Sequence, residues 1–162
     1  MRDVAFHIAP AREPADLAAI ATLFASYAAS LDVDLGYQDF ASELATLPGK
    51  YAPPTGALLL ARDPDTKPLG CVALRALDIE GCCEMKRLYV SPQARGLGLG
   101  RALIMAISAE AERIGYRELR LDTLPGMTEA ISLYEAAGFV PIAPYYETPI
   151  AGTRFFARIL TG

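Results

Sequence analysis

The sequence lacks the residues and spacings on which several common kinds of site depend. It has only three cysteines, Cys71, Cys82 and Cys83, and no Cys-x-x-Cys spacing, so we expect no metal site. Adjacent cysteines do not readily pair with each other, and we expect all three to be buried as small hydrophobic residues. The one histidine, His7, stands in a predicted strand, and no Gly-x-Ser-x-Gly motif is present. Both facts argue against a hydrolase with a nucleophilic triad.

The chain also lacks an excess of positive charge and any long hydrophobic run. Its formal net charge is -4, which gives no general attraction to nucleic acid or to an anionic lipid surface. Nowhere do about 18 uncharged apolar residues follow one another, which excludes a membrane-spanning helix. The first residues show no apolar run typical of a signal peptide. We therefore expect a cytoplasmic protein that binds neither nucleic acid nor membrane.

What the sequence does have is the composition of a globular domain. Of its 162 residues, 52% are hydrophobic and 21% are charged, a balance that is typical of folded proteins and not of disordered ones. A chain of this length can bury a core without disulfides. Internal repeats, low-complexity tracts and linkers are absent from the sequence, so we predict a single domain over residues 1–162.

Apolar periodicity predicts the element order β-α-α-β-β-β-α-β-α-β-β. The strands are predicted at residues 4–11, 57–63, 69–77, 82–90, 117–124, 139–146 and 153–160. The helices are predicted at residues 13–32, 37–47, 99–116 and 127–138. Short links between the early strands favour antiparallel pairing, whereas the later strand-helix-strand order indicates one parallel pair. The sequence thus predicts a mixed α/β fold with a central, mostly antiparallel sheet of about six to seven strands, flanked by about four helices.

A glycine-rich stretch joins the predicted strand at 82–90 to the predicted helix at 99–116. It reads SPQARGLGLGRAL, with glycines at 96, 98 and 100 between Arg95 and Arg101. Glycine permits left-handed backbone conformations, so successive N–H groups can point at one centre. The start of the helix adds unpaired N–H groups and the positive end of its dipole. The stretch therefore predicts a site for a phosphate or pyrophosphate, the alternative being a flexible loop with glycines kept for tight packing.

Two familiar phosphate-binding motifs do not match this stretch. A nucleotide P-loop needs lysine and then serine or threonine after its last glycine, where this chain has Arg101 and Ala102. The dinucleotide fingerprint needs a glycine at the position of Arg101 and belongs to the first turn of a parallel sheet. The spacing Arg-x-x-Gly-x-Gly, formed by Arg95, Gly98 and Gly100, instead resembles the acyl-CoA pyrophosphate loop of the GNAT superfamily of N-acyltransferases.

The resemblance runs from Glu84 to Phe139 and includes the later stretch LYEAAGF, residues 133–139. It implies that acetyl-CoA lies in a cleft where the two parallel strands, 82–90 and 117–124, splay apart. It implies the following contacts with acetyl-CoA: Leu88, Tyr89, Val90, Arg95, Gly96, Leu97, Gly98, Leu99, Gly100 and Arg101. One position departs from the family pattern, because Met127 stands where an asparagine is common; Thr128 is the alternative source of that polar contact.

The resemblance also implies a reaction, the transfer of an acetyl group from acetyl-CoA to a primary amine by direct attack. It implies that Tyr134 is the general acid and that Glu84 is the base, acting directly or through a water molecule. The alternatives are a core-facing tyrosine and a glutamate that only pairs with a cation on its own strand. Strand alternation places Glu84 on the same side as Lys86, Leu88 and Val90.

The acceptor is expected across the sheet from the cofactor, as a small amine or an exposed amino group of a peptide. Four tyrosines are the candidates for its binding site: Tyr27, Tyr37, Tyr145 and Tyr146. The sequence does not identify the acceptor, and clustered tyrosines also occur in ordinary packing. The alternative function is a catalytically silent acyl-CoA-binding sensor or accessory module. Proteins that look like this one are commonly dimers, so the resemblance also allows a homodimer.

Overall fold

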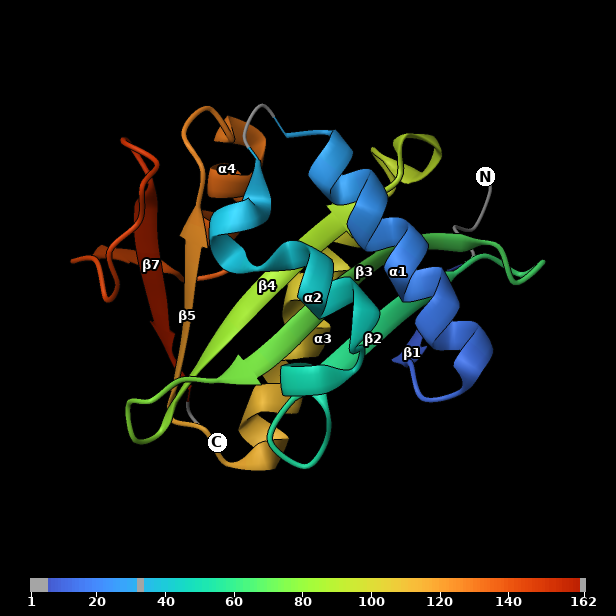
Figure 1. Cartoon of the computed structure of the whole chain (residues 1–162), viewed down its shortest axis with the longest axis horizontal. Helices are drawn as coiled ribbons and strands as arrows, with labels where there is room; N and C mark the ends of the chain where they lie inside the picture. Colours follow the sequence, from blue (N-terminus) through green and yellow to red (C-terminus); the bar gives the residue numbers. More distant parts are fainter. Residues whose placement is uncertain (1–5, 32–33, 161–162) are drawn as a thin grey trace.

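The computed structural model describes residues 6–31 and 34–160, apart from the side chains of residues 37 and 38. The strands of the described part form one sheet in the order β1-β2-β3-β4-β5-β7-β6 (Figure 1). Their bounds are β1 (His7–Pro10), β2 (Ala57–Arg62), β3 (Pro68–Ala76), β4 (Cys82–Val90), β5 (Glu118–Thr123), β6 (Val140–Ile142) and β7 (Arg154–Ile159). All neighbouring strands pair antiparallel except β4 and β5, which are parallel. The mixed, mostly antiparallel sheet with one parallel pair is confirmed.

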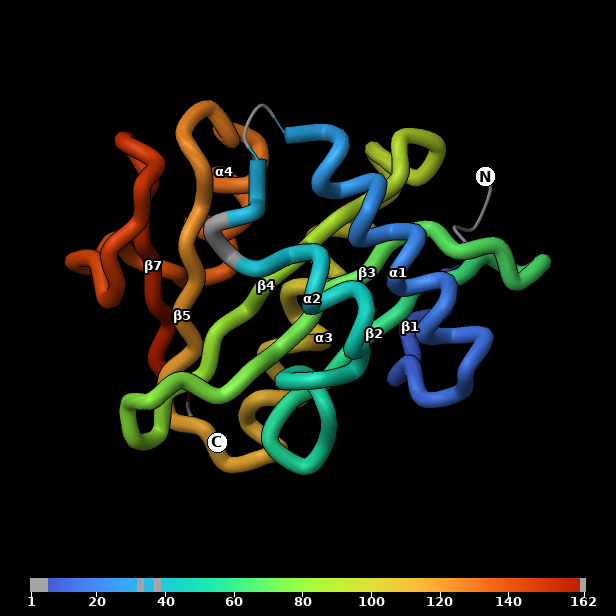
Figure 2. Tube along the Cα trace, viewed as in Figure 1, coloured from blue at the N-terminus to red at the C-terminus, as the bar shows by residue number. Residues whose placement is uncertain are grey.

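Helices cover both faces of the sheet. Their bounds are α1 (Pro14–Ala29), α2 (Phe40–Ala45), α3 (Leu99–Ile114) and α4 (Thr128–Ala136), with short 3-10 turns η1 (Leu35–Gln38), η2 (Gly49–Tyr51) and η3 (Pro92–Ala94). Helices α1 and α2 lie over one face, and α3 lies behind the sheet (Figures 1 and 2). Successive side chains of β2 point to opposite faces of the sheet, so Leu58 and Leu60 pack with α1 whereas Leu59 packs with α3. Burial on both faces therefore places the centre of the sheet in the hydrophobic core.

The parallel pair is short, and this shapes the site. Strands β4 and β5 are paired only from Cys82 to Glu84 on β4 and from Glu118 to Arg120 on β5. Strand β4 nevertheless continues to Val90 and β5 to Thr123. The two strands therefore separate beyond Glu84, and the facing edges of their backbones have no partner in each other.

A β-bulge interrupts β4 next to this opening. Val72 of β3 faces two residues of β4, Arg87 and Leu88, because the register of the two strands shifts there. Arg87 has a φ of 60°, in the left-handed region that non-glycine residues seldom adopt. A bulge adds one residue to one strand only, so the side chains that follow it point to the opposite faces from those that simple alternation assigns.

The bulge overturns one expectation from the sequence. Leu88 and Val90 pack with Met85 into the core on the α3 side. Glu84 lies on the opposite face, where its carboxylate is 3.7 Å from the ammonium of Lys86. The prediction that Glu84 shares a side with Leu88 and Val90 is wrong, because strict alternation fails where the extra residue enters the strand.

Two predicted elements are shorter than their apolar patterns indicated. Strand β6 ends at Ile142 and not at residue 146, and Pro141 and Pro144 lack the N–H groups that would continue a ladder. Helix α2 begins only at Phe40, after a separate 3-10 turn, because Asp39 adopts a left-handed φ of 57° between them. Both changes leave irregular segments beside the gap between β4 and β5: Leu35 of the 3-10 turn lines the gap, and Tyr146 of the loop after β6 reaches Asp122.

Several simpler expectations can be compared with the described residues directly. The three cysteines are buried and carry free thiols. In residues 6–31 and 34–160, no helix combines the length and the apolar character that crossing a membrane requires. The same residues hold no group of three or more His, Cys, Asp or Glu side chains that could bind a metal ion.

Candidate active site

The glycine-rich loop adopts the backbone that its sequence indicates at two of its three glycines. Gly96 has a φ of +82° and Gly98 a φ of +81°, and a Cβ added at either would meet no atom within 4 Å. Gly98 is also the N-cap of α3, whose first N–H groups have no partner within the helix. Open space therefore lies beside a left-handed backbone and a helix N-terminus, the arrangement that suits an anionic ligand.

The third glycine has a different role from the one expected. Gly100 lies within the first turn of α3, and a Cβ there would come within 3.1 Å of Leu133 Cδ1. Leu133 belongs to α4, so Gly100 allows the two helices to pack closely. Only Gly96 and Gly98 therefore give the loop its left-handed backbone.

The two arginines of the loop differ in their contacts. The Nε of Arg95 donates a hydrogen bond of 3.2 Å to the carbonyl of Val90, which ties the loop back to the end of β4. Arg101 is exposed in the first turn of α3. Both side chains remain accessible to a ligand. The hydrogen bond from Arg95 to Val90 could not be predicted from the position of Arg95 in the motif.

A groove of about 790 Å³ runs along the loop and the end of β4. Nine of the ten residues predicted to contact acetyl-CoA line it: Leu88, Tyr89, Val90, Arg95, Gly96, Gly98, Leu99, Gly100 and Arg101. The tenth, Leu97, packs against the hydrophobic core. Thr128, the alternative to the missing asparagine, lies at the same groove together with Met127.

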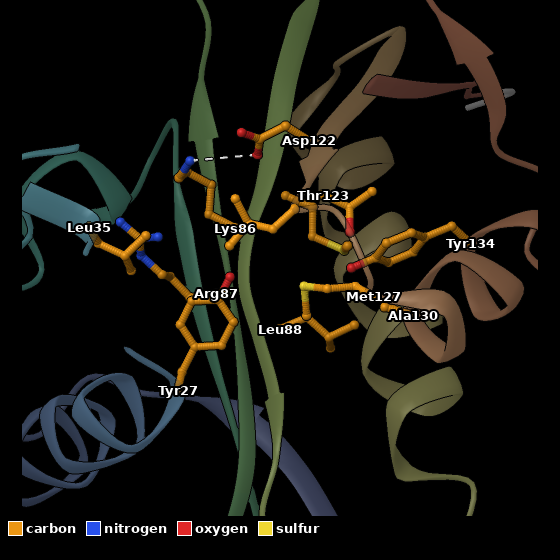
Figure 3. Close-up of a pocket in the computed structure, with 12 residues that line it drawn as sticks. Tyr27, Leu35, Lys86, Arg87, Leu88, Asp122, Thr123, Met127, Ala130 and Tyr134 are labelled. Atoms are coloured by element: carbon orange, nitrogen blue, oxygen red, sulfur yellow. Dashed lines mark ion pairs between the residues drawn. The ribbon is translucent and has the colours of Figure 1, made fainter. Parts of the chain in front are cut away.

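The gap between β4 and β5 forms a second cavity next to this groove. Residues 85–88 line it on one side and residues 122–124 on the other, with Tyr134 reaching in from α4 (Figure 3). The hydroxyl of Thr123 is buried there and has no hydrogen-bond partner among the described residues. Unpaired strand edges and an unsatisfied hydroxyl are polar groups that a ligand with amide groups can satisfy.

Tyr134 is held in the wall of this cavity by aromatic packing. It is 6% exposed, and its ring lies 6.0 Å from that of Phe139 and 6.3 Å from that of Phe156. Burial raises the pKa of Tyr134 above its usual value, and the nearby Tyr27 and Asp122 raise it further. The hydroxyl therefore keeps its proton at neutral pH and can act as a proton donor.

Glu84 is fixed on the other side of the sheet by three side chains. It is 3% exposed, and the hydroxyl of Tyr145 donates a hydrogen bond of 2.6 Å to its Oε2. Its Oε1 lies 3.7 Å from Lys86 Nζ and 3.8 Å from an Nη of Arg75. The ion pair with a cation on the same strand, the alternative to a role as base, is present, but the carboxylate is also oriented by a residue 61 positions away in the sequence.

Asp122 is a second carboxylate near the site, and the sequence reasoning missed it. The hydroxyl of Tyr146 donates a hydrogen bond to its Oδ2, and its Oδ1 lies 3.9 Å from Lys86 Nζ. The one signal in the sequence was an acidic residue near the end of a strand that the resemblance places at the gap. The ammonium of Lys86 thus lies between two carboxylates, those of Glu84 and Asp122.

Lys86 connects the gap to a third cavity, of about 330 Å³, on the face that carries Glu84. Its side chain is 8% exposed and lines both cavities, with its ammonium toward Asp122 (Figure 3). Glu84, Tyr145 and Tyr146 line the third cavity. Tyr134 therefore lines the gap and Glu84 the neighbouring third cavity, and Lys86 lines both.

The four candidate acceptor tyrosines do not form one group. The rings of Tyr145 and Tyr146 lie 5.7 Å apart, beside Glu84 and Asp122. Tyr27 instead contacts the ring of Tyr89 at 6.4 Å and lines the groove at the glycine-rich loop. The side chain of Tyr37 lies outside the described part of the structure. The acceptor side of the site is therefore centred on Tyr145 and Tyr146.

Comparisons with known proteins agree with this geometry. Residues 19–139 match the model of the acetyltransferase (GNAT) family. An uncharacterized N-acetyltransferase of Schizosaccharomyces pombe is 43% identical over 143 residues, which cover 88% of each chain. A solved acetyltransferase of the GNAT family from Staphylococcus aureus has the same fold, with a TM-score of 0.80, 20% identity, and coverage of 97% of this chain and 100% of that one.

A further solved structure, from Salmonella typhimurium, contains its cofactor acetyl-CoA. It superposes with a TM-score of 0.70 at 21% identity and covers 97% of this chain and 95% of that chain. The open parallel pair and the glycine-rich loop define an acyltransferase fold, and the family match covers most of the chain. The protein belongs to the acetyltransferase (GNAT) family.

Proposed function

We propose that this protein transfers the acetyl group of acetyl-CoA to the primary amine of an acceptor by direct attack of the amine on the thioester. The name of the S. pombe relative supports transfer to nitrogen, and the S. typhimurium structure of the same fold contains acetyl-CoA. The observation that carries the proposal is the opening between β4 and β5, which has the cofactor groove at one end and Glu84 at the other.

The residues present fit acetyl-CoA. The left-handed backbone at Gly96 and Gly98 leaves open space beside N–H groups, where a diphosphate can bind. The unpaired edge of β4 near Leu88 offers backbone groups to the pantetheine amides. When bound, acetyl-CoA supplies an acyl group activated as a thioester. Its thioester end would reach the gap in which Tyr134 and the unsatisfied Thr123 hydroxyl lie.

Glu84 serves as the base in this proposal. An amine that arrives protonated must lose a proton before its nitrogen can attack, and a carboxylate facing the acceptor cavity can accept that proton directly or through water. The hydrogen bond from Tyr145 and the charges of Arg75 and Lys86 hold the carboxylate in place. The C–N bond then forms as the C–S bond breaks.

Tyr134 serves as the acid. Its hydroxyl faces the gap, and its raised pKa keeps it protonated, so it can give a proton to the departing thiolate. A thiol is a fairly acidic leaving group, so this assistance is worth less than the removal of the proton from the amine. The hydroxyl of Tyr134 has no hydrogen-bond partner among the described residues, and it is thus available to the leaving sulfur.

Two measurements on the purified protein test the proposal. Calorimetry with acetyl-CoA should show binding, and a panel of amines with acetyl-CoA should release free thiol at a rate above the background without acceptor. Binding without thiol release on any amine would instead support a catalytically silent sensor. Absence of binding would overturn the proposed function altogether.

A further inference from the structure

The acceptor cavity contains more positive charge than a site for a simple amine requires. Three cationic side chains line it, those of Lys50, Arg75 and Lys86. Two carboxylates line it, Glu84, which is buried at the inner end, and Asp78, which is exposed on the β3–β4 hairpin. The amine of an acceptor is itself cationic before it reacts, so three neighbouring cations would repel an acceptor that carried no other charge.

Lys50 is only weakly neutralised by the protein. Its Nζ lies 3.6 Å from Glu43 Oε1, but that carboxylate already accepts hydrogen bonds of 2.9 Å and 3.0 Å from Arg87. Burial lowers the pKa of Lys50, Glu43 opposes this, and repulsion by Arg75, Lys86 and Arg87 adds to the lowering. The mutual repulsion of these cations is a cost that a bound anion would remove.

Arg75 has hydrogen-bonding capacity that no described carboxylate uses. Its Nε donates to the carbonyl of Ala76 at 3.2 Å, while its Nη is 3.8 Å from Glu84, beyond hydrogen-bond distance. Its side chain is 29% exposed at the cavity. A guanidinium with free donors in a partly enclosed cavity is a common binding group for a carboxylate.

We propose that the acceptor is a small amine that carries a carboxylate, with its amine toward Glu84 and its carboxylate toward Lys50 and Arg75. The inference rests on the proposed function and names the substrate class of the same site. Both charges of such a molecule have a partner in the cavity, since Arg75 lies 3.8 Å from Glu84 and Lys50 lines the same cavity. The cavity of about 330 Å³ suits a small molecule, and the rings of Tyr145 and Tyr146 form its apolar wall.

Matched acceptors provide the test. Acetylation of leucine and phenylalanine, followed by thiol release, is compared with that of isoamylamine and phenethylamine, which lack only the carboxylate; the other common amino acids and their amides complete the panel. We expect kcat/KM for the best amino acid to exceed that for its decarboxylated partner by about tenfold or more, the factor that one charge-assisted hydrogen bond provides.

Two variants connect this preference to the named residues. Lys50→Gln and Arg75→Gln should each reduce the ratio of kcat/KM between acid and matched amine by about tenfold. Lys67→Gln in the β2–β3 turn and Arg113→Gln on α3 are matched controls on exposed positions and should leave the ratio unchanged.

The outcomes separate the inference from the function on which it rests. If acetyl-CoA binds and amines without a carboxylate react as well as amino acids, or only a protein amino group reacts, the inference is wrong and the proposed acetyltransferase function stands. An acid preference that survives both variants also overturns the assignment to Lys50 and Arg75. If acetyl-CoA does not bind, the proposed function fails and the inference fails with it.

Discussion

The two sides of the opening between β4 and β5 are built in different ways. The cofactor side consists largely of main chain from one continuous segment, residues 95–101, in which two glycines set the backbone. The acceptor side consists of side chains from separate segments: β3 and β4, the end of β5, the turn η2, and the loop that carries Tyr145 and Tyr146. One side is exposed and local in sequence, and the other is assembled from distant residues around the buried Glu84.

This difference has a physical consequence. Backbone N–H groups are the same whatever the side chains are, so a loop that binds through its main chain needs only the right conformation. A site made of charged side chains depends on each partner, because a buried charge that loses its partner is costly. We therefore expect changes on the acceptor side to affect stability and rate together, and changes in the loop to act mainly on cofactor binding.

The largest expected effect is on stability, at the ion pair that anchors α2 to the bulge of β4. Arg87 donates two hydrogen bonds to Glu43, and both side chains are at least 95% buried. Glu43→Gln should lower the free energy of unfolding by about 3–5 kcal/mol, because the guanidinium of Arg87 would be left without a countercharge. Urea unfolding measures this. Glu110→Gln, in an exposed pair with Arg113, is the control and should change little.

The same pair predicts a dependence on pH. Burial raises the pKa of Glu43, but the hydrogen bonds and charge of Arg87 and the charge of Lys50 outweigh it and lower the pKa below 4.5. A carboxyl with a lowered pKa stabilises the fold above its unfolded value and loses that contribution as the pH falls through its folded value. The wild type should therefore lose stability below about pH 4.5 more steeply than Glu43→Gln. Parallel curves would show that the pair contributes little.

The next effect is on rate, at the base. Glu84→Gln should reduce kcat by about a hundredfold at neutral pH, because the protonated amine loses its proton acceptor. Activity should recover as the pH rises and the amine loses its proton to solvent. Glu135→Gln, exposed on α4, is the matched control. A reduction that is constant across pH would show that Glu84 only orders its neighbours.

The third effect is on cofactor affinity. Gly98→Val should weaken acetyl-CoA binding by about thirtyfold or more, since a β-branched residue strains a left-handed backbone and its Cβ enters the space beside the N–H groups. Calorimetry gives the Kd. Gly115→Val, at a φ of +112° at the end of α3, introduces the same kind of strain far from the loop; it should lower stability and leave the Kd unchanged. Equal effects on the Kd would remove the loop from cofactor binding.

The smallest effect concerns the acid. Tyr134→Phe should lower kcat about tenfold with little change in KM, because only the departing thiolate needs the proton. Burial raises the pKa of Tyr134, so the wild type should show no loss of activity from its ionisation below pH 10. Tyr116→Phe, which removes a hydroxyl bonded to the carbonyl of Thr55, is the control. Unchanged turnover in Tyr134→Phe would leave this residue a packing role only.

Local patterns predicted what depends on local conformation. The left-handed glycines 96 and 98, the helix that follows them and the order of the strands could be predicted, because each is determined by neighbouring residues. The bulge at Arg87 could not, because its signal is a shift of register against β3. Strict alternation therefore assigned Leu88 and Val90 to the wrong face.

The acceptor side was predicted only in part for the same reason. Tyr145 and Tyr146 stood out as polar aromatics in a proline-containing stretch, but nothing near them in the chain indicated Glu84 or Asp122 as partners. Tyr27 and Tyr145, both partly buried, could not be assigned to different cavities from composition. Lys86 gave no signal of its position between two cavities, since lysine on a strand is most often exposed.

The amino-acid sequence by itself determined the mixed α/β class, the element order and the left-handed loop before α3, because torsional preference and apolar periodicity act over a few residues. The tertiary structure alone decided where β4 and β5 separate, which face each residue of β4 occupies after the bulge, and how Lys50, Arg75 and Lys86 come to surround one cavity. Those features depend on the pairing and charge of groups far apart in the chain, whose energies exist only once the sheet has formed.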